Sequence, residues 1–304
     1  MSYTHNNHLK FYVNDVLYGT RKTSLDTYRV EVGSVDWDHY RKLDLNTEFT
    51  RIADLIYADY GKEVELYFSG GTDCEIVLKS FLSIGIKPRL ITVKYSDGSN
   101  LFEVHAAAKL ASEYGLKIHI VDFDVREFFH SGAAEEIATQ VYCSQLFFCV
   151  IYDVVRQRGQ PAVMGGNVPL TRKVGNYKSF WYYTYMETEE SSSIRFSRKF
   201  NIPVTYEFFS YTPEAMLYYL DSDDIKNLVY GNNYKLKLES SKNAILNKFV
   251  PNLRLRTKTH GWEKILPFAH EAERKIMSDQ INRLTDCLDG IEYTECISQL
   301  KGIK

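Results

Sequence analysis

The chain lacks a long apolar run, a secretion signal and an excess of charge of either sign. No apolar stretch in its 304 residues reaches the ~18 residues that a membrane-spanning helix needs, and the polar start MSYTHNNHLK is not a signal peptide. The 37 lysines and arginines nearly balance the 39 aspartates and glutamates. We therefore expect no membrane partner. Nucleic acid is not expected either, because a dedicated binder would be strongly basic.

Cysteine is scarce and scattered. The five cysteines stand at positions 74, 143, 149, 287 and 296, and none forms a Cys-x-x-Cys pair. The sequence therefore predicts neither a zinc knuckle nor a disulfide scaffold, and a reducing cytoplasm is the simplest location. Cys143 and Cys149 fall in a helical stretch, where a turn of about 100° per residue would place them on different faces.

Residues 66–74, Leu-Tyr-Phe-Ser-Gly-Gly-Thr-Asp-Cys, are the most informative stretch. They predict a strand that ends at Ser69, a turn with two glycines, and a helix that begins at Glu75. The glycines allow a tight turn, and the free N–H groups of the new helix favour a phosphate there. Asp73 suits such a site if Mg²⁺ bridges the carboxylate and the phosphate. The alternative is a plain glycine-rich turn between strand and helix.

The following residues predict parallel βαβ units, because strand and helix patterns alternate. The expected elements are strands at 87–95 and 116–123, a helix at 101–114, a helical stretch at 135–158, and a strand in Pro161-Ala-Val-Met-Gly-Gly-Asn167. Parallel sheets bind ligands at the carboxyl ends of their strands. The glycines after the last strand are therefore expected at the same edge as the 69–74 turn.

Ser69-Gly70-Gly71-Thr72-Asp73 resembles the SGGxDS signature of the PP-loop, or N-type, ATP pyrophosphatases. Within that superfamily the chain resembles the C-terminal domain of asparagine synthetases and the 7-cyano-7-deazaguanine synthases. The resemblance covers residues 62–170 and includes the pattern Asn100-x-x-Glu103. Cys74 stands where the family has serine, and a thiol is the weaker hydrogen-bond donor. The spacing fits neither a Walker loop nor a dinucleotide fingerprint.

This resemblance implies an α/β fold, with a parallel sheet flanked by helices, of the adenine nucleotide α-hydrolase-like, Rossmann-like type. It also implies sites for ATP and Mg²⁺, with Asp73 as the metal ligand and adenine against Val93. The implied cofactor-binding residues are Ser69, Gly70, Gly71, Thr72, Asp73, Cys74, Val93, Gly165, Gly166 and Asn167.

Two lysines are candidate catalytic groups in addition to Asp73. Lys258 follows Arg254 and Arg256 at alternate positions, so the three point to one side of an extended segment and could neutralise leaving pyrophosphate. Lys173 lies six residues beyond Asn167 and could contact a phosphate. The alternative for both lysines is a solvated surface cation.

The remaining segments predict a small N-terminal β-element, an aromatic hairpin and a mainly helical C-terminal part. The expected strands are 10–19, 28–35 and 180–186, the last pairing with 194–200, and the expected helices are 45–60, 213–220, 240–249 and 268–288. We divide the chain into 1–61 (β-element and helix), 62–175 (ATP-binding core) and 176–304 (hairpin and helical region).

Together these patterns predict a ligase that cleaves ATP to AMP and pyrophosphate. The reaction would activate a carboxylate or amide-type oxygen of a small-molecule substrate for ammonia or an amine. The chain has Ser2 rather than a cysteine after its first methionine, so free ammonia, an amine or a separate glutaminase would supply nitrogen. Sulfur transfer, phosphoadenylylsulfate reduction and a decayed nucleotide-binding module are the alternatives. The oligomeric state is left open.

Overall fold

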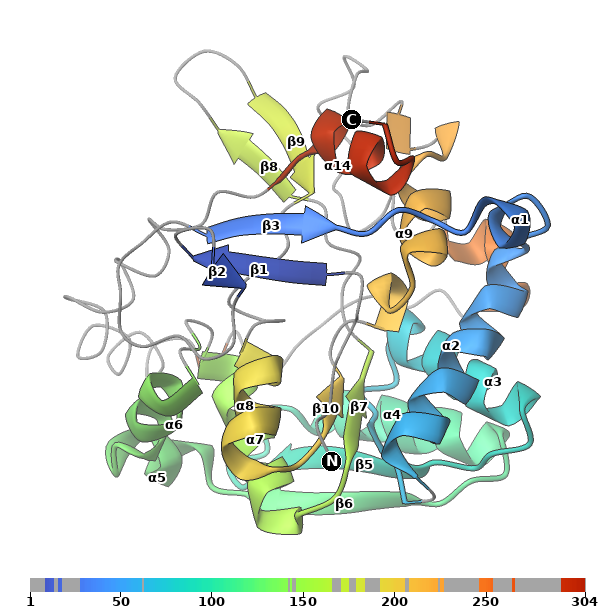
Figure 1. Ribbon diagram of the computed structural model, residues 1–304. Helices are drawn as coiled ribbons and strands as arrows, with labels where there is room; N and C mark the ends of the chain where they lie inside the picture. Colours follow the sequence, from blue (N-terminus) through green and yellow to red (C-terminus); the bar gives the residue numbers. More distant parts are fainter. Residues whose placement is uncertain are drawn as a thin grey trace.

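The centre of the fold is a five-stranded parallel sheet in the order β10-β7-β4-β5-β6 (Figure 1). This computed structural model describes residues 9–13, 16–17, 28–61, 63–141, 143, 146–165, 171–174, 179–183, 192–205, 208–223, 225–226, 246–253, 264–265 and 291–303. The strands are β4 (Glu65–Tyr67), β5 (Arg89–Tyr95), β6 (Ile118–Phe123), β7 (Ala162–Met164) and β10 (Val204–Thr205). The predicted α/β class with a parallel sheet is confirmed.

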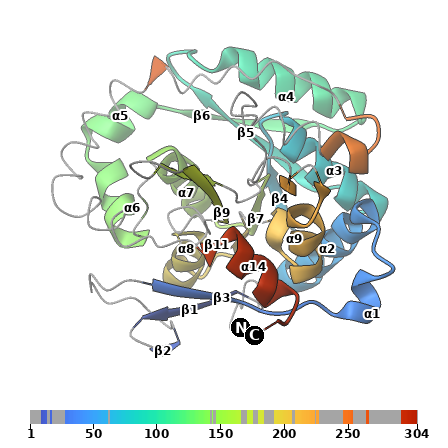
Figure 2. The same cartoon turned by 90° about the horizontal axis from the view of Figure 1, so that it is seen from above.

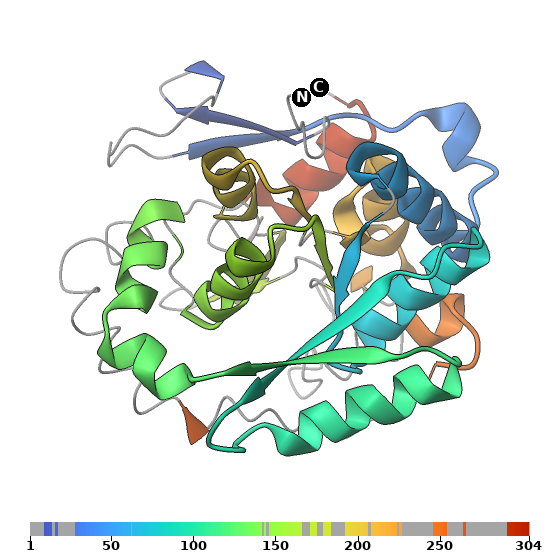
Figure 3. The same cartoon turned by 90° about the horizontal axis from the view of Figure 1, so that it is seen from below.

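Helices cover both faces of this sheet, because successive side chains of a strand point to opposite sides. Leu66 lies in the core formed with α2 (Leu45–Tyr60), α3 (Thr72–Ser83), α4 (Leu101–Glu113) and α9 (Pro213–Leu220). Its neighbour Tyr67 lies in the opposite core, formed with α5 (Val125–His130), α6 (Ala133–Val141), α7 (Leu146–Arg158) and α8 (Ser192–Phe200). Figure 3 shows the sheet between these two groups of helices.

The other elements form a second layer beside the sheet (Figure 1). The predicted N-terminal β-element is confirmed as an antiparallel sheet of β1 (Leu9–Val13), β2 (Val16–Leu17) and β3 (Tyr28–Val32), followed by α1 (Trp37–Tyr40). Another antiparallel sheet contains β8 (Thr171–Val174), β9 (Ser179–Tyr183) and β11 (Ile291–Glu292), and α14 (Tyr293–Leu300) follows it. Val35 N donates to Leu300 O at 3.0 Å, so segments from opposite ends of the chain meet in this layer.

The second strand of the predicted hairpin, at 194–200, is wrong. Strand β9 pairs with β8, whereas residues 192–200 form helix α8. Phe196 and Phe200 lie four residues apart with ring centroids 4.7 Å from each other, and the exposed Arg198 and Lys199 lie between them. This spacing gives a helix one apolar face, which decides against a strand.

The helical stretch expected over 135–158 is confirmed, and it consists of two helices, α6 and α7, bent by 93°. At the end of α6, Cys143 N donates to Ala138 O five residues back, a wider turn than the α-helix has. The bend lets the Cys143 thiol hydrogen-bond the Cys149 thiol, so the expectation that these side chains lie on different faces is wrong.

The helix predictions for the C-terminal part fall partly outside the described residues. Helix α9 has the predicted bounds and the predicted N-cap, since Thr212 Oγ1 accepts from Ala215 N at 3.3 Å. Residues 246–249 are helical, within the helix expected at 240–249. The helix expected at 268–288 lies outside the described residues.

In the part of the chain described here, no single helix is long and apolar enough to cross a membrane. Helices α6 and α7 reach that length and apolar content only as a pair, across their bend.

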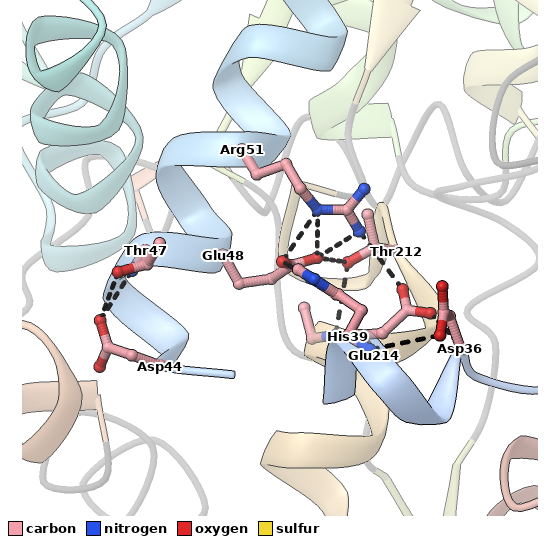
Figure 4. Close-up of polar contacts among 9 residues, drawn as sticks. Asp36, His39, Asp44, Thr47, Glu48, Arg51, Thr212 and Glu214 are labelled. Carbon is pink, nitrogen blue, oxygen red and sulfur yellow. Dashed lines mark hydrogen bonds and ion pairs between the residues drawn. The ribbon is translucent and has the colours of Figure 1, made fainter. Parts of the chain in front are cut away.

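A buried carboxylate, Glu48, ties α9 to the N-terminal helices (Figure 4). Thr212 Oγ1 donates to Glu48 Oε1 at 2.6 Å, Arg51 Nη2 donates to the same oxygen at 2.7 Å, and His39 Nε2 lies 2.7 Å from Glu48 Oε2. The neighbouring Glu214 lies 3.4 Å from Arg51 Nη2. We call these five residues the Glu48 clamp. It joins α1, α2 and α9.

We expect the clamp to make stability depend on pH. Burial alone would raise the pKa of Glu48, but hydrogen bonds from Arg51, Thr212 and His39 outweigh burial and hold it below the ordinary value. The stability contributed by a carboxylate with a lowered folded pKa is present above the unfolded pKa of about 4.3 and is lost as the pH falls through the folded pKa. In urea unfolding at neutral pH, Glu48→Gln should lower the free energy of unfolding by about 1–3 kcal/mol.

The same variant should also lose stability less steeply in acid than the wild-type protein does. Asp54→Asn is the matched control, since Asp54 is an exposed carboxylate of the same helix, α2. A Glu48→Gln protein with wild-type stability and a wild-type acid slope would contradict this account of the clamp.

Candidate phosphate-binding site

The loop between β4 and α3 is short, because β4 ends at Tyr67 and α3 begins at Thr72. The helix thus begins three residues before the expected Glu75, and Asp73 belongs to its first turn. Gly70 has φ +71°, a left-handed conformation that glycine adopts readily. Gly71 is the N-cap residue, and no side chain caps α3, unlike α2 and α9, which are capped by Asp44 and Thr212. An uncapped helix N-terminus suits an anion.

The buried Cys74 thiol contacts both Ser69 of the loop and the end of β4. Its Sγ donates to Tyr67 O at 3.6 Å and lies 3.4 Å from Ser69 Oγ, which accepts from Gly71 N at 3.3 Å. The residue is 6% exposed. Burial raises the pKa of this thiol, and the negative charges of Asp73 and Glu103 add to the effect. Cys74 therefore stays a neutral thiol that holds Ser69 against the end of β4.

Gly165 brings the turn after β7 against this loop. Strand β7 is the neighbour of β4, and Gly165 follows its last residue. A Cβ at Gly165 would lie 3.0 Å from Cys74 Sγ, 3.1 Å from Cys74 N and 3.2 Å from Asp73 Cβ. A side chain at this position would force a neighbouring atom to shift, so the loops after β4 and β7 lie side by side. Gly166 and Asn167, predicted to extend this contact, lie outside the described residues.

At the end of β5, Asn100 is a structural residue. Its Oδ1 accepts from Tyr95 N at 2.9 Å and its Nδ2 donates to Val93 O at 2.8 Å, so it closes the turn that leads into α4. The Val93 side chain lies in the core shared with α5–α8. The predicted adenine contact at Val93 stays a prediction.

Two residues outside the loop that interact electrostatically with loop residues were not predicted as site residues from the sequence. The charge of Glu103, in the first turn of α4, acts on both Cys74 and Tyr95. Tyr219 of α9 is 4% exposed; burial raises its pKa above the usual range, and the charge of Asp73 adds to the rise. Glu103 is part of the Asn100-x-x-Glu103 pattern noted in the sequence. Nothing in the sequence links Tyr219 to the loop at 69–74, which lies far from it along the chain.

The described residues contain no group of three or more His, Cys, Asp or Glu side chains placed to hold a metal. Magnesium in nucleotide sites is commonly held by one or two carboxylates, and phosphate oxygens and water complete its shell. Asp73 at the uncapped end of α3, with Glu103 nearby, is compatible with that kind of site.

The two candidate lysines are not brought to the loop by any described contact. Lys173 lies on β8, opposite Phe180 of β9, and Lys258 lies outside the described residues. The chain just before Lys258 packs on α3, since Lys79 Nζ donates to Pro251 O at 2.6 Å and Leu253 belongs to the same core as Cys74. Residues 251–253, which precede the cationic segment in the chain, therefore lie beside the helix that carries Asp73.

No family model and no curated protein matches the chain. Solved structures do overlap with it, among them two of low identity. A predicted subunit of tRNA methyltransferase from Methanocaldococcus jannaschii is 16% identical with a TM-score of 0.36, covering 72% of this chain and 95% of its own. NMN synthetase from Francisella tularensis is 11% identical with a TM-score of 0.34, covering 73% of this chain and 98% of its own. Similarity this low assigns no function.

Gly165→Ala tests the contact between the two loops. The added methyl group meets the backbone nitrogen of Cys74 at 3.1 Å, so backbone must move, and we expect a loss of about 1–3 kcal/mol in the free energy of unfolding. Gly71→Ala is the matched control for folding, because its Cβ would meet only Ser69 Oγ at 3.4 Å, an ordinary contact. Equal stability of the two variants in urea unfolding would show that the loops do not touch as described.

Proposed function

We propose that the chain is an ATP-dependent synthetase that cleaves ATP to AMP and pyrophosphate. The cleavage would activate a carboxylate or amide-type oxygen for attack by ammonia or an amine. The observation that carries the proposal is the close approach of Gly165 to Asp73 and Cys74. Because of this approach, the Ser-Gly-Gly-Thr-Asp loop and the turn after β7 would form the two sides of one site. That site would lie at the carboxyl edge of the parallel sheet, where such sheets bind ligands.

In this proposal the phosphates lie against residues 69–74 and the uncapped N-terminus of α3. Gly165, Gly166 and Asn167 close the other side, and adenine lies near Val93. Asp73 holds Mg²⁺, which supplies charge neutralisation at the phosphates when bound. Lys173 and Lys258 are the cations that we assign to the departing pyrophosphate.

The chemistry requires positioning more than a protein nucleophile. The substrate oxygen attacks the α-phosphorus, the bond to the β-phosphate oxygen breaks, and pyrophosphate leaves. Ammonia or an amine then attacks the adenylated carbon, and AMP leaves with the bonding electron pair. The chain's own groups have to align the attacking oxygen and hold the phosphates, a task suited to the backbone amides of the loop and the Asp73 carboxylate.

Within the superfamily that the loop resembles, we favour the asparagine synthetase-like branch and a cytoplasmic location. A separate glutaminase is one possible source of the ammonia.

Sulfur chemistry is the second candidate, and the contact between Cys143 and Cys149 is the observation that favours it. Against it, the four described cysteines, Cys74, Cys143, Cys149 and Cys296, are all buried, and burial raises the pKa of both Cys149 and Cys296. Thiolates, not thiols, are the reactive forms. We therefore expect Cys143→Ser and Cys296→Ser to retain ATP cleavage, and loss of activity in either would favour a sulfur relay.

Product analysis tests the main proposal. With Mg-ATP, ammonium and pools of carboxylates, amino acids and nucleobases, the wild-type protein should release AMP and pyrophosphate with one pool. Asp73→Asn should reduce the rate at least about 100-fold, as removal of a group that stabilises transition-state charge does. Asp54→Asn, an exposed site on α2, is the control. Release of ADP and phosphate would contradict the adenylation mechanism.

The variant Cys74→Ser distinguishes a catalytically active site from a nucleotide-binding site that has lost its activity. A hydroxyl is smaller than a thiol and the stronger donor, and the thiol's contacts lie inside the protein. We therefore expect little change in ATP turnover. A large gain on restoring the family's serine would instead indicate a nucleotide-binding module that has lost catalysis.

A further inference from the structure

Strand β6 forms one edge of the parallel sheet. It lies beside β5, and the two strands pair without interruption over Ile118–Phe123. Figure 1 shows β6 along the lower side of the molecule, and Figure 3, seen from below, looks onto it. Viewed from above, β6 and α4 lie along the same side of the molecule (Figure 2). The strand at the opposite edge, β10, has two residues, both buried, so β6 is the longer and more exposed edge.

The backbone of β6 presents hydrogen-bonding groups on the side away from β5. Phe123 O accepts from Ser96 N, which follows β5, at 3.0 Å, so the backbone of Phe123 points toward β5. Successive residues of a strand point their N–H and C=O groups to opposite sides. The backbone groups of Ile118, Ile120 and Asp122 therefore face outward, as a row with which another strand can pair.

The middle of this edge is apolar and exposed. Ile120 is 47% exposed. Natural edge strands are commonly protected from pairing by shortness, by proline or by a bulge. Strand β6 is six residues long, contains no proline and stays in register with β5 throughout. None of these three protections therefore applies to it.

Charges of opposite sign stand at the two ends of this edge. Lys117 comes just before the strand, is exposed, and makes no ion pair with any described residue. Asp124 comes just after the strand and is exposed, with one carboxylate oxygen accepting from Glu127 N. Asp122 is compensated by Lys94, at 2.6 Å. A strand with a basic start and an acidic end is complementary in charge to an antiparallel copy of itself.

We propose that two copies of this chain associate through β6, which pairs antiparallel with its counterpart about a twofold axis at Ile120. Residues whose backbone groups face outward form the hydrogen-bonded pairs, so Ile120 pairs with its own counterpart and Ile118 pairs with Asp122. The two Ile120 side chains then lie together, and Lys117 of each copy lies beside Asp124 of the other. The inference is independent of the proposed function, because β6 contributes no residue to the phosphate loop.

Sedimentation equilibrium of the full chain tests the association. We expect a wild-type dimer at micromolar concentration. Ile120→Lys should raise its dissociation constant at least about tenfold, because like charges directly opposite each other destabilise a strand pair. Ile303→Lys is the matched control, since Ile303 is also an exposed isoleucine, 62% exposed, and follows α14. A wild-type monomer, or a dimer that Ile120→Lys leaves intact, would overturn the inference.

Lys117→Glu tests the contribution of charge. Losing two surface ion pairs should raise the dissociation constant about 2–30-fold, and added salt should weaken the wild-type dimer more than this variant. An unchanged dissociation constant would contradict the antiparallel arrangement.

A cross-link tests the register. Hydrogen-bonded antiparallel pairs have Cα atoms about 5.5 Å apart, within the range that a disulfide spans. Ile120→Cys should therefore give a covalent dimer with diamide, which takes up the two protons and two electrons that the two thiols release. Ile303→Cys is the control. Equal cross-linking of the two variants would show that the axis does not lie at Ile120.

Discussion

The close approach of Gly165 to the first turn of α3 is the constraint on which the site depends. Strands β4 and β7 are neighbours, so the chain segments that leave them share one small space. A methyl group added at Gly165 would lie 3.0 Å from Cys74 Sγ and 3.1 Å from Cys74 N, so a neighbouring atom would have to shift to admit it. The same packing explains why a cysteine is accommodated in the phosphate loop, since its sulfur fills the gap between Ser69, Tyr67 and Gly165.

Buried carboxylates hold the frame around this contact from two directions. At the amino end of the sheet, Arg158 Nε donates to Glu65 at 2.7 Å, and Arg89 lies 3.4 Å from the same side chain. Beside α9, the buried carboxylate is Glu48, which accepts hydrogen bonds within the Glu48 clamp. In each case a charge is removed from water and compensated by arginine, the arrangement that a buried carboxylate needs. The loops at the carboxyl edge therefore lie on a rigid support.

The sequence predicted the elements whose pattern is local. Four of the five parallel strands, β4–β7, and the helices α2, α4 and α9 repeat apolar residues at strand or helix spacing, and Thr212-Pro213 marks the start of α9 unambiguously. The fifth strand, β10, was not predicted. Prediction failed where tertiary contacts decide. Helix α6 ends at Val141 and α7 begins at Leu146, although no glycine or proline lies between these residues. Residues Ser192–Phe200 contain aromatic residues that suit a strand, but they form a helix.

The layer beside the sheet is assembled from three separate parts of the chain: the sheet β1–β3 with α1, strands β8 and β9, and residues 291–300. Val35 and Leu300 join two of these parts through a backbone hydrogen bond. None of them supplies a strand to the parallel sheet. Insertions and substitutions can therefore accumulate in this layer during evolution while the phosphate loop and its support stay the same.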